Sequence, residues 1–215
     1  GVRLSEFNQV KSQGLPAYVN SMVQLPAIGS TSWEQNAELI LINASDPPSL
    51  QGKFPSQQQL SRWLIDLMMR SEHPFQEVLA MFWHDHFATS SIVLDSNSLY
   101  WMKNHINLFR EQGVGNYRQL LKDVARDPAM LVWLDGIINT RNAPNENFAR
   151  EFWELFTLGV DNGYTQIDIE ESAEAFTGYR NRFDNATGLD IVVFDPNFHN
   201  PGAKIILGIP ISGQN

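Results

Sequence analysis

The chain has 215 residues, 43% hydrophobic and 11% aromatic, and this composition excludes an intrinsically disordered protein. Its 24 acidic and 15 basic residues give a net charge of −9, which repels phosphate backbones and argues against nucleic-acid binding. Cysteine is absent, which excludes disulfides, thiolate metal sites and cysteine nucleophiles, and no apolar run is long enough for a membrane span.

Residues 1–45 are predicted to form N-terminal helices. Ser5 can cap a short first helix, and Pro16 suits the first turn of a second one. Residues 33–42 have the pattern of a third helix. Residues 46–55 are polar and contain prolines, so they are predicted to form a loop.

Residues 56–178 are predicted to form the helical core. Ser56 can cap its first helix, and Pro74 fits the first turn of the next. Asp127 and Pro128 end one helix and begin another, because proline disfavours the α conformation in the preceding residue but suits a first turn. The helices expected after Pro74 cover residues 75–89, 97–112, 116–126, 128–135, 145–159 and 165–178.

The hydrophobic pattern changes in the C-terminal region, 179–208. Residues 179–183 and 189–194 are short aromatic or β-branched runs on either side of a turn-like segment, which predicts a β-hairpin. The fold class is therefore mainly α, and we expect a single domain over residues 1–215. It would be a multi-helix, orthogonal or bundle-like domain with a small β-hairpin near the C-terminus. His199 is a candidate for a polar cluster in this region.

The helix predicted over residues 145–159 divides into an apolar sector and a polar one. At about 100° per residue its aromatic side chains fall on one side. The polar side chains opposite are Glu146, Asn147, Arg150, Glu151 and Glu154. They can line a cleft in which Glu151 is a base or metal ligand and Arg150 an anion clamp. Alternatively they form a solvated face, where pairs spaced by four residues contribute a few tenths of a kcal/mol each.

Two of the five histidines are predicted to point into the core. His84 and His86 are separated by about 200° on their helix, and His86 falls in the apolar arc that contains Val78 and Phe82. His84 is therefore expected on the polar side. His105 lies near the centre of the apolar arc of the next helix, so His86 and His105 are expected to share an interior.

These histidines allow two interpretations. With a carboxylate such as Glu151 or Glu154, His86 and His105 can form an acid/base site or bind a divalent metal, namely Zn, Fe or Mn. Alternatively, both are buried histidines hydrogen-bonded within the core. No helix motif that pairs glutamate with histidine supports the metal site.

Several motifs, in order along the chain, resemble one bacterial family. They are residues 82–87, 127–131, 145–159, 163–166, 175–178 and 194–208. Together they are similar to the DUF1800 family, over about residues 3–208. The matched pattern includes Asn145, Glu146, Asn147, Arg150 and Glu151, and with the resemblance a functional polar face is as well supported as a merely solvated one. Some relatives have histidine where this chain has Phe156, and this difference argues against a ligand at that position.

The resemblance implies little about activity, because the family is named for having no assigned function. Its members resemble large, often exported bacterial proteins, which usually extend beyond the equivalent of Gly208. We therefore expect a periplasmic or extracellular protein and a chain that is part of a longer one, although the first residues lack the apolar core of a signal peptide.

Two functional hypotheses follow. The first is an exported protein with a polar site, metal-dependent or acid/base, on the helix with Glu146, Arg150 and Glu151; His86, His105 and Glu154 would be its metal ligands. The second is a non-catalytic envelope or extracellular module, structural or binding, whose polar helix contacts a protein partner or a second copy of the chain. The remaining candidate site residues are Asn145, Asn147, His84 and His199. The sequence does not identify a substrate.

Overall fold

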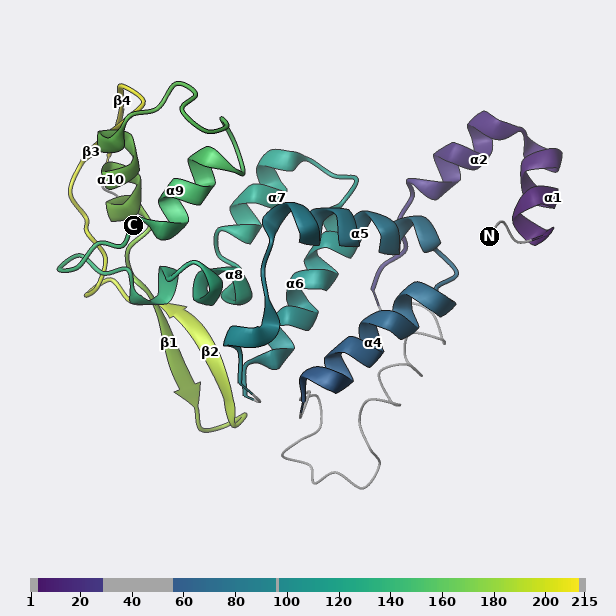
Figure 1. The fold of residues 1–215 in the computed structure, drawn as a ribbon, viewed down its shortest axis with the longest axis horizontal. Helices are drawn as coiled ribbons and strands as arrows, with labels where there is room; N and C mark the ends of the chain where they lie inside the picture. Colours follow the sequence, from purple (N-terminus) through teal and green to yellow (C-terminus); the bar gives the residue numbers. More distant parts are fainter. Residues whose placement is uncertain (1–3, 29–55, 96, 213–215) are drawn as a thin grey trace.

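A computed structural model describes residues 4–28, 56–95 and 97–212 (Figure 1). The predicted helix at residues 33–42 and the loop at 46–55 lie outside the described residues. The described part is mainly α, with two small antiparallel strand pairs near the C-terminus, and this confirms the predicted fold class. None of the described helices is long and apolar enough to cross a membrane.

The helices follow one another closely along the chain. Two short 3-10 turns, Ser91–Val93 and Gly136–Ile138, connect some of them. The helices described are α1 (Leu4–Gln13), α2 (Leu15–Met22), α4 (Gln57–Arg70), α5 (Pro74–Phe87), α6 (Leu99–Gln112), α7 (Tyr117–Val124), α8 (Pro128–Trp133), α9 (Asn147–Glu154) and α10 (Gln166–Ala175). In Figure 1, α1 and α2 lie at one end of the molecule, and α9, α10 and the strands lie at the other.

Local capping explains where several helices begin. The Ser56 hydroxyl accepts a hydrogen bond from the backbone N–H of Gln59, as its position predicts. Asp127 accepts from the N–H of Met130 at the start of α8. Thr165 and Asp168 form a capping box at the start of α10. These starts agree with the sequence because each depends on residues no more than three positions apart.

All six helices predicted after Pro74 are shorter in the structure than predicted, and α9 differs most. Helix α5 ends at Phe87, because Ala88 adopts the left-handed conformation with φ 47°. Helix α9 covers only Asn147–Glu154. Its end is followed by a tight turn in which the N–H groups of Leu158 and Gly159 both bond to the carbonyl of Trp153, and Gly159 has φ 92°.

The core is aromatic and lies in two main clusters. One packs Trp63 of α4 against Trp101 and Ile106 of α6. The other joins α5, α6 and α9, and in it the rings of Phe87 and Phe109 stack with centroids 5.5 Å apart. This packing makes α5 and α6 the centre of the molecule.

The predicted hairpin is confirmed, and a second strand pair follows it. Strands β1 (Tyr179–Asp184) and β2 (Leu189–Phe194) pair antiparallel in the register Tyr179 to Phe194. Strands β3 (Lys204–Ile206) and β4 (Ile209–Ile211) were not predicted. Three-residue strands are too short to show an alternating pattern. The N–H of Leu207, in the turn between them, donates to Asp168, which holds this pair against α10.

Candidate functional site

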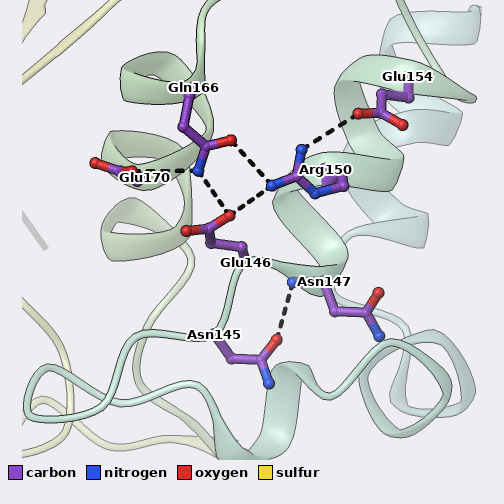
Figure 2. A network of polar contacts seen from close by, with 7 residues as sticks. All are labelled: Asn145, Glu146, Asn147, Arg150, Glu154, Gln166 and Glu170. Atoms are coloured by element: carbon purple, nitrogen blue, oxygen red, sulfur yellow. Dashed lines mark hydrogen bonds and ion pairs between the residues drawn. The ribbon is translucent and has the colours of Figure 1, made fainter. Parts of the chain in front are cut away.

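The polar side of α9 carries a connected hydrogen-bond network, which Figure 2 shows. Arg150 Nη2 lies 2.7 Å from Glu146 Oε2, and Arg150 Nη1 lies 3.4 Å from Glu154 Oε1. Gln166, the first residue of α10, accepts from Arg150 at 3.0 Å and donates to Glu146 at 2.9 Å. Its amide also donates to Glu170 at 3.2 Å. The network therefore joins α9 to α10.

This network meets solvent. The side chain of Arg150 is 39% exposed and that of Glu146 is 37% exposed. Arg150 already has three acceptors, so its guanidinium is not an empty anion clamp. The arrangement is that of a surface ion-pair network between two helices.

Asn145 and Asn147 order the backbone before α9. The Asn145 side chain accepts from the N–H of Asn147 at 2.9 Å, and the N–H of Asn145 donates to Asn139 at 2.9 Å. Asn147 also donates to Asp135 at 3.1 Å. Asn139, which the sequence did not single out, is buried and donates to the carbonyl of Ala173 at 2.8 Å. These amides connect the loop before α9 to α10.

Glu151 does not join the Arg150 network. No hydrogen bond from another described side chain reaches its carboxylate. Burial raises the pKa of Glu151, the charge of Glu154 raises it further, and the charge of Arg150 partly opposes both. Of the three predicted catalytic residues, the structure thus pairs Arg150 with Glu146 and leaves Glu151 apart.

The predicted orientations of the histidines on α5 are wrong. His84 is half-buried, and its ring meets that of His105 edge-on, with centroids 5.8 Å apart. His86 is also half-buried, but it packs against Tyr117 and Phe156, with the Phe156 centroid 6.0 Å away. The histidine that reaches His105 is therefore His84.

The error arises because α5 buries its more polar face. Residues Glu77, Ala80, His84 and Phe87 lie on one side of the helix and face inward. Val78 and Phe82, which the apolar arc predicted to be inside, are 64% and 59% exposed. Glu77 is buried because it forms a two-point ion pair with Arg110 of α6, with both bonds at 2.8 Å. The sequence of α5 alone does not reveal that Glu77 has a charged partner on another helix.

His105 is buried, as predicted, and its two ring nitrogens have partners. Nδ1 lies 2.8 Å from Asp127 Oδ1, and Nε2 lies 2.5 Å from Thr89 Oγ1. The order carboxylate, imidazole and hydroxyl resembles that of a hydrolytic triad. All three residues are buried, however, so a substrate has no access to the hydroxyl. The two hydrogen bonds instead link Thr89, just after α5, through His105 of α6 to Asp127 at the start of α8.

The structure does not bring the predicted metal ligands together. Glu154 is paired with Arg150, and His105 is bonded to Thr89 and Asp127. Over residues 4–28, 56–95 and 97–212, no three histidine, aspartate or glutamate side chains are grouped so that they could hold a metal ion. His84 Nδ1 is buried and has no hydrogen-bond partner, and burial is the main reason that the pKa of His84 falls to about 4.

His199 is buried beside the first hairpin and has a structural role. Its Nδ1 lies 2.9 Å from the carbonyl of Thr177, to which it donates. Gly178, with φ 108°, packs against Phe194 and His199, and a Cβ there would lie 2.7 Å from the Phe194 ring and 3.0 Å from the Cβ of His199. Glycine is therefore needed for this close approach.

A groove of about 440 Å³ lies between α7, α9, α10 and the first hairpin. This volume is within the range of small-molecule sites. The residues that line it are Arg118, Leu121, Lys122, Ala125, Arg126, Phe152, Ala175, Phe176, Tyr179 and Phe194. The sequence does not predict this groove, because its walls come from segments far apart in the chain. The only signal available was the spacing of Arg118, Lys122 and Arg126 at every fourth residue.

Replacing Arg150 with alanine tests how much the network contributes to the stability of the fold. We expect the free energy of unfolding to fall by no more than about 1 kcal/mol, because exposed ion pairs contribute little. Urea denaturation measures this change. Arg70→Ala is the matched control, since Arg70 makes a single exposed i,i+4 pair with Asp66 at 3.1 Å. A loss of several kcal/mol from Arg150→Ala alone would show that the network supports the fold.

Comparison with known proteins supports the resemblance seen in the motifs. The family model described as "Protein of unknown function (DUF1800)" matches residues 1–215. Neither the curated proteins nor the solved structures contain a match. Because the family model covers the whole chain, the protein belongs to the DUF1800 family.

Proposed function

We propose that the chain is a binding module that holds a small molecule with an apolar body in the groove between α7 and α10. The observation that carries this proposal is the groove itself, whose walls include four aromatic side chains: Phe152, Phe176, Tyr179 and Phe194. Small-molecule sites are typically concave, largely apolar and preformed. Phe194 is 42% exposed, so apolar surface is left for a ligand to cover.

Most of the residues that suggested catalysis in the sequence are paired with one another or buried in the structure, which favours a binding function. Arg150 is already hydrogen-bonded to Glu146, Glu154 and Gln166, and Thr89, His105 and Asp127 are buried. The second candidate function is an acid/base site at Glu151. The raised pKa of that carboxyl supports it, but no other described side chain hydrogen-bonds to the Glu151 carboxylate, and the neighbouring Arg150 is already paired with Glu146 and Glu154. We therefore favour binding over catalysis.

Two further expectations remain predictions. Export to the periplasm or the cell exterior rests on the resemblance to the family alone. A protein partner or a second copy of the chain could contact the exposed Arg150 network. Neither is needed for the groove to bind a ligand.

Filling the groove should abolish its binding. Ala175 ends α10 and lines the groove, so Ala175→Leu places a larger apolar side chain in the space that a ligand would occupy. We expect the neutral fluorophore N-phenyl-1-naphthylamine to bind the native protein and to bind this variant about tenfold more weakly, a change of about 1.4 kcal/mol. Fluorescence titration measures both affinities.

Ala17→Leu is the matched control, because Ala17 is an exposed alanine on α2, at the other end of the molecule. It should leave the affinity unchanged. The proposal is wrong if the native protein does not bind the fluorophore, or if Ala175→Leu binds it as tightly as the native protein does.

A further inference from the structure

One wall of the groove carries three cationic side chains. Arg118 and Lys122 lie one turn apart on α7, and Arg126 lies in the turn that follows. Four residues of helix rise about 6 Å, so Arg118 and Lys122 are spaced by about this distance along one edge of the groove. All three side chains are exposed. The groove therefore has a basic edge beside an aromatic wall.

These charges are not neutralised by the groove itself. Its lining includes no aspartate or glutamate. Within the described chain, none of the three cations forms a salt bridge. The neighbouring carboxylate, Asp123, has its pKa lowered mainly by hydrogen bonds from Gln119 and Gln112, and only then by the charges of Arg126 and Lys122. Asp123 therefore interacts mainly with the side-chain amides of Gln119 and Gln112, and less with Arg126 and Lys122.

The charge of the groove is opposite to that of the protein. The chain has a net charge of −9, and an excess of positive charge at a concave apolar surface is therefore a local feature. Charges at the rim of a low-dielectric cleft raise the local concentration of ions of opposite sign. Arginine and lysine are also the usual partners of carboxylate and phosphate groups.

We propose that the ligand of this groove is an amphipathic anion: a molecule with a flat apolar body and a carboxylate, sulfonate or phosphate group. The apolar body would lie against Phe176 and the other aromatic side chains, and the anionic group would meet Arg118, Lys122 and Arg126. This inference rests on the proposed binding function and adds the charge of the ligand to it.

Two fluorophores that differ in one group test the inference. 8-Anilinonaphthalene-1-sulfonate carries a sulfonate that N-phenyl-1-naphthylamine lacks. At neutral pH and low salt, we expect the native protein to bind the sulfonate about tenfold more tightly, as three partly exposed charge contacts allow. Added salt should weaken binding of the anionic fluorophore more than that of the neutral one.

The variant Arg118→Gln/Lys122→Gln/Arg126→Gln should remove this preference. We expect it to bind the sulfonate about tenfold more weakly than the native protein and the neutral fluorophore equally well. Arg62→Gln is the control, because Arg62 is exposed on α4, outside the groove. It should change neither affinity.

The possible failures are distinguishable. If the native protein binds both fluorophores equally, or if Arg62→Gln has the same effect as the triple variant, the preference for an anion is overturned and the groove remains a neutral apolar site. If neither fluorophore binds, both the inference and the proposed function are overturned.

Discussion

Glu77→Ala is expected to lower the free energy of unfolding by about 3–5 kcal/mol, the largest effect of any single change considered. The Glu77 carboxylate accepts from Nε and Nη2 of Arg110, and both side chains are buried between α5 and α6. Removing the carboxylate leaves the guanidinium charge in the core without its main counterion. Urea denaturation of the two proteins measures the difference.

A double replacement separates the burial of charge from the loss of packing. Glu77→Leu combined with Arg110→Met removes both charges and keeps most of the side-chain volume. We expect it to be more stable than Glu77→Ala, because apolar replacements of buried ion pairs are often neutral or stabilising. A loss below about 1 kcal/mol from Glu77→Ala would mean that water reaches the Arg110 guanidinium and that α5 and α6 do not enclose it.

Acid should destabilise the protein through His84. Burial, and secondarily the charge of His105, lower the pKa of His84 to about 4, from 6.5 in an unfolded chain, while Asp85 opposes the shift. As the pH falls below 6.5, the unfolded state takes up a proton that the folded state does not. The stability that neutral His84 contributes is therefore complete above pH 6.5 and is lost progressively down to about pH 4. The loss is at most about 3 kcal/mol.

His84→Gln removes this titration and should flatten the profile of unfolding free energy between pH 6.5 and 4.5. His86→Gln is the control, because burial lowers the pKa of His86 too, but this residue is less enclosed than His84. Its profile should stay close to that of the native protein. If the profiles of His84→Gln and the native protein have the same slope, His84 is protonated in the folded state and does not lie in a closed environment.

The parts of the fold that depend on neighbouring residues were predictable. Ser56, Asp127 and Thr165 each mark a helix start, because a capping side chain and the N–H that it accepts from lie within three residues. The hairpin of β1 and β2 also has a local signal. The end of α9 was not predictable, because apolar residues continue after Glu154 although the helix does not.

The candidate site was less predictable, because it depends on pairs that are distant in sequence. The apolar arc of α5 placed Phe82 inside, whereas the ion pair of Glu77 with Arg110 draws the opposite face into the core. Periodicity measures the polarity of a helix and not whether its polar groups have partners. The groove is a similar case, since Phe152, Tyr179 and Arg118 meet only after three elements have packed.

We propose that ligands bind in the groove and not at the polar face of α9. Titration of 8-anilinonaphthalene-1-sulfonate into Ala175→Leu and Arg150→Ala distinguishes these two surfaces. We expect about tenfold weaker binding to Ala175→Leu, and an unchanged dissociation constant for Arg150→Ala, whose side chain does not line the groove. The opposite result, in which Arg150→Ala loses binding and Ala175→Leu keeps it, would assign the site to α9 instead of the groove.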